Sequence, residues 1–134
     1  MASSVAAPQS AAQQKLILQM AQRASNGKEV LLALRAAAGV FSAAAAGRGS
    51  EARVRAVATA KMMSMGTLDQ LIEYAMSYPV DAQSTRPFIE RIFSLADSQT
   101  DARTWYRIKM AAFHLKVGDL ERQAQAKGDQ LARK

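Results

Sequence analysis

The hydrophobic and polar positions of the chain follow helical spacing, and the most apolar stretch is 29–46, EVLLALRAAAGVFSAAAA. Val30, Leu34 and Phe41 recur at intervals that place them on one helix face, and other apolar residues fill the remaining directions. A helix without a polar face must be buried, so this stretch is predicted to be the central core helix. It is too short for a membrane span of about 20 apolar residues, and Arg35 would be costly in lipid.

Glycines, prolines and capping residues divide the chain into about six to seven helices. The predicted helices are near 10–26, 29–46, 51–65, 68–78, 85–96, 101–117 and from 119 into a frayed end at 132–134. Because the connections are short, sequential helices are expected to be antiparallel neighbours. The predicted fold class is all-α, a compact bundle or a short stack of antiparallel helices around the buried helix 29–46. Residues 1–9 are expected to form a flexible tail, and 10–134 a single helical domain with a frayed C-terminus.

Two local patterns carry specific expectations. One face of helix 51–65 is formed by Ala52, Ala56, Ala60 and Met63. Its small residues would let another helix approach closely. Further along, Gly118 is expected to end one helix and Asp119 to cap the next.

The net charge of +7 over 134 residues is distributed unevenly. Residues 1–66 contain eight basic and two acidic residues, whereas 67–134 contain ten basic and nine acidic residues. A positive field of this kind attracts polyanions, namely nucleic acid, an anionic membrane surface or an acidic partner protein, although solvated helix surface is the simpler interpretation. The residues that would contact a polyanion are Arg48, Arg53, Arg55 and Lys61.

Most catalytic chemistry is excluded by composition. The chain has no cysteine and a single histidine, His114, so a Cys–His pair and a multi-histidine metal site are impossible. No GxSxG elbow and no phosphate-binding glycine loop occurs. The sequence therefore predicts no enzyme, no cofactor, no metal and no small-molecule substrate.

Methionines and aromatic residues offer a different kind of surface. Met is flexible and suits adaptable partner-binding surfaces, although filling gaps in a core is the alternative use. Met63 is assigned to the core. The candidate partner-binding residues are Met62, Met65, Tyr74, Tyr78, Tyr106 and His114.

The segment 104–125, TWYRIKMAAFHLKVGDLERQAQ, resembles a tetratricopeptide-type helical hairpin. The positions that carry the resemblance are Met110, Ala111, His114, Gly118 and Leu120, and Met62, Gly66 and Leu68 repeat part of the spacing. Arg107 stands where the family usually has Trp, and Gln123 where it has a small residue. The two turn glycines are 52 positions apart, whereas the repeat length of the family is about 34. The resemblance implies a scaffold that binds a peptide or helix in a groove, without catalytic residues.

Together these patterns favour a non-enzymatic interaction protein, namely an adaptor, a small chaperone-like protein or a structural subunit. Its partner would be another protein or a second copy of the chain. A nucleic-acid-associated coat or packaging component is the alternative, and membrane binding is not favoured. The N-terminus lacks the apolar core of a secretory signal, so an intracellular, cytoplasmic location is expected, with organellar import as the alternative.

Overall fold

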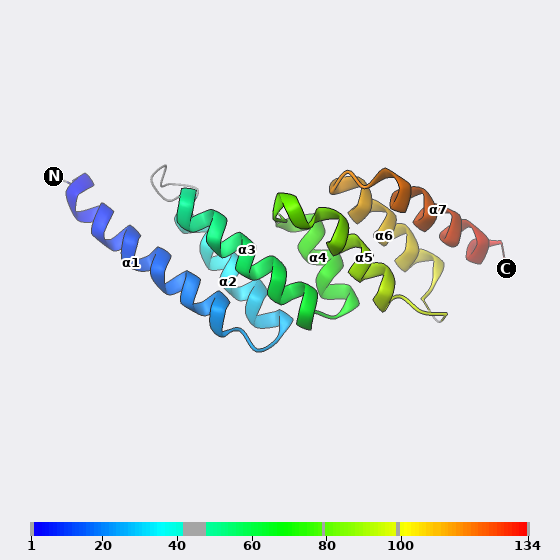
Figure 1. Cartoon of the computed structure of the whole chain (residues 1–134), viewed down its shortest axis with the longest axis horizontal. Coiled ribbons are helices and arrows are strands. Elements are labelled where there is room, and N and C mark those ends of the chain that lie inside the picture. Colours follow the sequence, from blue (N-terminus) through cyan, green and yellow to red (C-terminus); the bar gives the residue numbers. More distant parts are fainter. Residues whose placement is uncertain (1, 42–47, 79, 99, 134) are drawn as a thin grey trace. The chain divides into compact units, whose positions relative to one another are not determined.

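The computed structural model describes residues 2–41, 48–78, 80–98 and 100–133, and within these ranges it describes side chains for 12–37 and from 52 onward. This part of the chain forms seven α-helices, one short 3-10 helix and no β-strand (Figure 1). The helices are α1 (Ala2–Arg23), α2 (Gly27–Phe41), α3 (Arg48–Met65), α4 (Leu68–Ser77), η2 (Ala82–Ser84), α5 (Thr85–Leu95), α6 (Ala102–His114) and α7 (Gly118–Ala132). The prediction of an all-α fold with short connections is confirmed.

The helices group into two compact units, Met1–Gly66 and Thr67–Lys134, which we call unit 1 and unit 2. Sequence analysis treated 10–134 as one domain, whereas contacts within the structure group the helices into these two sets. The division falls at the position where the charge changes, so unit 1 carries a net charge of +6 and unit 2 of +1.

Unit 1 is a bundle in which α1, α2 and α3 each pack against the other two. Its core is made of aliphatic side chains and alanines: Ile17, Ala21, Ala24, Val30, Leu31, Ala33, Leu34, Ala37, Val54, Ala58 and Met62. The helix α2 supplies much of this core, as its apolar sequence predicts.

The helix α2 was predicted to be buried on every side, but only one side of it is buried. Leu32 is 47% exposed, and Arg35 and Ala36 are exposed as well. Two neighbouring helices can cover only the side of α2 that faces them. The end of the predicted helix at 42–46 lies outside the described residues.

The face of α3 that is buried is opposite to the predicted one. Ala52, Ala56 and Ala60 are exposed, whereas Val54 and Met62 are buried in the core. Burying the larger apolar side chains removes more apolar area from water, so the bundle orients α3 in this way. The small-residue face therefore does not receive another helix of unit 1.

Unit 2 consists of two helical hairpins, α4–α5 and α6–α7, and α6 contacts all three other helices. The two hairpins begin alike, because Thr67 and Asp101, 34 positions apart, are the N-caps of α4 and α6. Their backbone angles agree, φ −78° and ψ 168° for Thr67, and φ −81° and ψ 169° for Asp101. Each side chain accepts a hydrogen bond from the backbone N–H three residues later, which satisfies a free donor of the first turn.

The turn between α6 and α7 differs from the prediction. Lys116, with φ 63°, takes the left-handed conformation at the end of α6. Gly118, which was expected to end that helix, is the first residue of α7. The N–H of Val117 donates to Ala112 O at 2.9 Å, and that of Lys116 to Phe113 O at 3.0 Å, which is a Schellman ending. Asp119 does not cap α7 with its side chain.

The helix α1 begins at Ala2, earlier than the predicted start near Ser10. The alanines and glutamines of this segment have high helix propensity, which the prediction of a tail did not weigh. At the other end, α7 continues to Ala132, and Arg133 is its C-cap.

Candidate functional site

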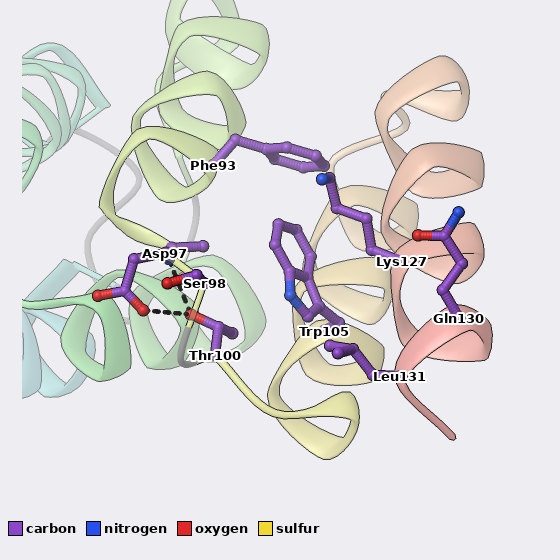
Figure 2. A pocket seen from close by; sticks show the side chains of 9 residues that line it. Phe93, Asp97, Ser98, Thr100, Trp105, Lys127, Gln130 and Leu131 are labelled. Atoms are coloured by element: carbon purple, nitrogen blue, oxygen red, sulfur yellow. Dashed lines mark hydrogen bonds between the residues drawn. The ribbon is translucent and has the colours of Figure 1, made fainter. Parts of the chain in front are cut away.

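A hollow of unit 2 lies beside Trp105, where the end of α5 and the loop after it meet α6 and α7 (Figure 2). The cavity has a volume of about 390 Å³. The Phe93 and Trp105 rings meet edge to face, with centroids 5.3 Å apart and an interplanar angle of 66°. Lys127 extends from α7 so that its Nζ lies 5.2 Å from the centroid of the Trp105 ring. An aromatic pair and a cation therefore form one side of the cavity.

The start of α6 fixes the position of Trp105. Asp101 Oδ1 accepts a hydrogen bond from Thr104 N at 2.8 Å, and Trp105 N donates to Asp101 O at 3.1 Å. Hydrogen bonds from the side chain and the backbone of Thr104 hold the pKa of the Asp101 carboxyl below its ordinary value. The loop before it is closed by Asp97 N, which donates to Thr100 Oγ1 at 2.9 Å (Figure 2).

The helix α7 forms the other wall of the cavity and is held on α6 through Tyr106. The Tyr106 hydroxyl donates to Asp129 Oδ1 at 2.8 Å, and Gln125 Nε2 donates to the same oxygen at 2.9 Å. The bond to the Asp129 carboxylate raises the pKa of Tyr106, because the protonated phenol is the donor. Gly128 lies against the Tyr106 ring, and a Cβ on it would be 2.7 Å from Tyr106 Cε1.

A second connection joins α7 to α5. Arg86 donates from Nη1 and Nη2 to the two carboxylate oxygens of Asp119, at 2.9 Å and 2.7 Å. This two-pronged pair raises the pKa of Arg86 and lowers that of Asp119. Asp119 thus stabilises the fold through this pair and not as the predicted cap.

The groups around the cavity are suited to non-covalent binding. They are an indole, a phenyl ring, an ammonium, a carboxylate and an amide, contributed by Trp105, Phe93, Lys127, Asp97 and Gln130. Within the described ranges, no three His, Cys, Asp or Glu side chains gather where they could hold a metal ion.

The outer face of α6 is a second candidate surface. Met110 is 45% exposed and Phe113 is 60% exposed, beside the exposed His114. Arg107 lies on the same side and pairs with Asp69 of α4, with Nη1 3.2 Å from Oδ1. In α4, Met76 is 38% exposed and stands 34 positions before Met110. Large apolar side chains on a helix surface are typical of interaction sites when they lie together.

Two of the predicted partner-binding residues are buried. Met62 and Tyr74 are both 0% exposed, Met62 in the core of unit 1 and Tyr74 in that of unit 2. The Tyr74 ring packs on Phe88, with centroids 5.2 Å apart. The assignment of these two residues to a surface is therefore wrong, because each lies on the inward stripe of its helix.

The other predicted partner-binding residues differ in exposure and lie in both units. Tyr106 is half-buried, with its hydroxyl bound to Asp129, and His114 is exposed on α6. Met65 and Tyr78 are half-buried in unit 1 and unit 2, respectively. Their roles in binding stay predictions.

The predicted polyanion contacts also differ in exposure. Arg53 is exposed, whereas Arg55 and Lys61 are half-buried. The Nζ of Lys61 donates to Ala24 O at 3.0 Å, so this ammonium holds the end of α1. The side chain of Arg48 lies outside the described residues.

Phe113 and Lys127 were not among the site residues predicted from the sequence. Phe113 was detectable, because helical spacing places it away from the helix face that carries Trp105, Ile108 and Ala112. Lys127 was not, since its position over Trp105 depends on how α7 packs on α6.

Comparison with known protein families, with curated proteins and with solved structures finds no significant match to this chain. Among the described helices, none has the length and apolar character needed to cross a membrane.

Proposed function

We propose that this chain is a non-enzymatic protein-interaction module: an adaptor, a small chaperone-like protein or a structural subunit of a larger assembly. The observation that carries the proposal is the outer face of α6, where Met110 and Phe113 are 45% and 60% exposed. Exposing two such side chains one turn apart favours a partner that covers them, because burial removes their apolar area from water.

The organisation of unit 2 supports the same proposal. The N-caps Thr67 and Asp101 are separated by 34 positions, which is the length of a tetratricopeptide repeat. Leu71 and Trp105, and likewise Tyr74 and Ile108, are buried at equivalent positions of the two hairpins. The proposal uses this spacing of 34 positions and not that of the turn glycines, because Gly66 lies between α3 of unit 1 and α4 of unit 2. Stacked hairpins of this kind present helix faces to peptides and helices.

A direct test is site-specific photo-crosslinking in cells of the source organism. A benzophenone amino acid replaces Phe113, and a matched variant carries it at Gln123, an exposed position of α7. The proposal predicts a discrete protein adduct from position 113 that is weak or absent from position 123. Equal adducts from both positions, or none from position 113, would refute it.

A nucleic-acid-associated function is the second candidate, because unit 1 carries eight basic and two acidic residues. Binding to phosphates would weaken steeply with salt, since it releases counterions. A mobility-shift assay with duplex DNA and RNA over a range of salt concentrations tests it. No shift at low salt would eliminate this candidate.

A further inference from the structure

The outer face of α1 combines apolar side chains with a cation. Leu16 is 57% exposed and Met20 is 38% exposed, and Arg23 is exposed one turn further on. Steps of four and three residues place all three on one side of the helix. Ile17 and Ala21 take the inward positions, whereas Leu16, Met20 and Arg23 lie outside the buried core of unit 1.

The outer face of α2 has the same composition. Lys28, Leu32 and Arg35 follow at steps of four and three, and all three are exposed, Leu32 by 47%. The inward positions are taken by Val30, Leu34 and other core residues.

The two outer faces lie at similar heights along the bundle. The helices α1 and α2 pack on each other and run in opposite directions from the short connection between them (Figure 1). With a rise of about 1.5 Å per residue, Met20 lies about 4–5 Å from the end of α1 at that connection, and Leu32 about 7–8 Å from the start of α2. Arg23 and Lys28 lie at the connection itself. Along the bundle axis, the apolar side chains of Met20 and Leu32 are therefore followed by the cations Arg23 and Lys28 toward the connection.

Unit 1 has little negative charge of its own to balance these cations. Its acidic residues are Glu29 and Glu51. Glu29 is engaged locally: its Oε2 accepts from Ser25 N at 2.8 Å and its Oε1 from Ser25 Oγ at 3.1 Å. Unit 1 therefore carries an excess of positive charge, a net +6 over its sequence.

We infer that the outer faces of α1 and α2 bind an acidic amphipathic helix, whose leucine-like side chains cover Leu16, Met20 and Leu32 while its carboxylates meet Arg23 and Lys28. The inference rests on the proposed interaction function and names the chemistry of one partner. Complementary charge guides the encounter, and apolar contact supplies affinity.

A nucleic acid fits this surface less well. Phosphates pair with cations, but they make no use of three exposed apolar side chains. Proteins that bind single strands stack bases on aromatic rings, and Phe41 is the only aromatic residue in the sequence of unit 1.

The test measures fluorescence anisotropy of a labelled synthetic helix, made of alanine and glutamate with leucines at i, i+4 and i+7, titrated with the full chain. A second peptide replaces the leucines by serines at the same charge. The double variant Arg23→Glu/Lys28→Glu and the single variant Leu32→Ser are compared with Arg53→Glu, which reverses an exposed charge on α3. Circular dichroism confirms that each variant is folded.

We expect the leucine peptide to bind at least about tenfold more tightly than the serine peptide. The double variant and Leu32→Ser each weaken binding by about fivefold or more, and Arg53→Glu by less than about twofold. Equal binding of both peptides, equal loss in Arg53→Glu and Leu32→Ser, or preferential binding of duplex DNA would overturn the inference. The crosslink from Phe113 in unit 2 is a separate measurement, so failure of this inference can be distinguished from failure of the proposed function.

Discussion

Replacing Gly128 by alanine is expected to destabilise unit 2, although alanine is normally the better helix residue. Gly128 is buried in α7, and a Cβ there would lie 2.7 Å from Cε1 and 2.9 Å from Cδ1 of Tyr106. The ring cannot move aside freely, because its hydroxyl is bound to Asp129 Oδ1, which Gln125 also contacts. The absence of a side chain at Gly128 is thus what lets α7 approach α6.

Two opposing effects set the size of the change. In an unhindered helix, glycine to alanine stabilises by about 1 kcal/mol. Forcing an extra carbon into a packed contact costs about 1–3 kcal/mol. Because two ring carbons would be closer than 3.0 Å and the ring is held at its hydroxyl, the upper part of that range applies. The net expectation is a loss of about 1–2 kcal/mol in the free energy of unfolding.

Urea denaturation followed by tryptophan fluorescence measures this change in unit 2, because Trp105 is the only tryptophan. The matched experiment introduces Gly128→Ala into a Tyr106→Ala background, where the opposing ring is absent. There the substitution should stabilise by about 1 kcal/mol, so its sign reverses. A stabilising effect in the native background, or equal effects in both backgrounds, would refute the close contact as the reason for glycine.

Three further outcomes follow from the structure. Lys116→Gly should stabilise unit 2 by about 0.5–1 kcal/mol in the same denaturation assay, because Lys116 has φ 63°, and no gain would refute this. Arg86→Gln should destabilise at neutral pH, and the deficit should disappear as the pH falls below the lowered pKa of Asp119, since protonation removes the pair in the native chain too. A deficit of constant size from neutral to strongly acidic pH would contradict that assignment. Lys61→Met should cost about 1 kcal/mol by leaving Ala24 O without its Nζ donor, and unchanged thermal melting of the helices would show the bond to be unimportant.

Helix spacing and capping signals were sufficient to predict most of unit 2. Thr67 and Gln70 form the capping box that their spacing indicates, with Thr67 N donating to Gln70 Oε1 at 3.0 Å. Trp105 and Ile108 are buried, as helical spacing of the apolar residues Trp105, Ile108 and Ala112 predicts. These features depend on interactions within a few residues, which a sequence pattern records directly.

Which faces of the apolar helices are buried was harder to predict. In α3, several faces are apolar, and the choice of Val54 over Ala56 for the core depends on what α1 and α2 present. The exposure of the candidate surfaces likewise depends on the neighbouring helices. The exposure of Leu32 and Phe113 results from how many neighbours each helix has, which no local pattern encodes.

The connection from α3 to α4 consists of only two residues, Gly66 and Thr67. Gly66 N donates to Met62 O at 2.8 Å, and the next residue, Thr67, already caps α4. The hydrogen bond that ends α3 involves residues before the peptide bond between Gly66 and Thr67, and those that cap α4 involve residues after it. A spacer, a tag or an additional domain inserted at that bond would interrupt no helix, which makes it the natural point for separating the two halves genetically.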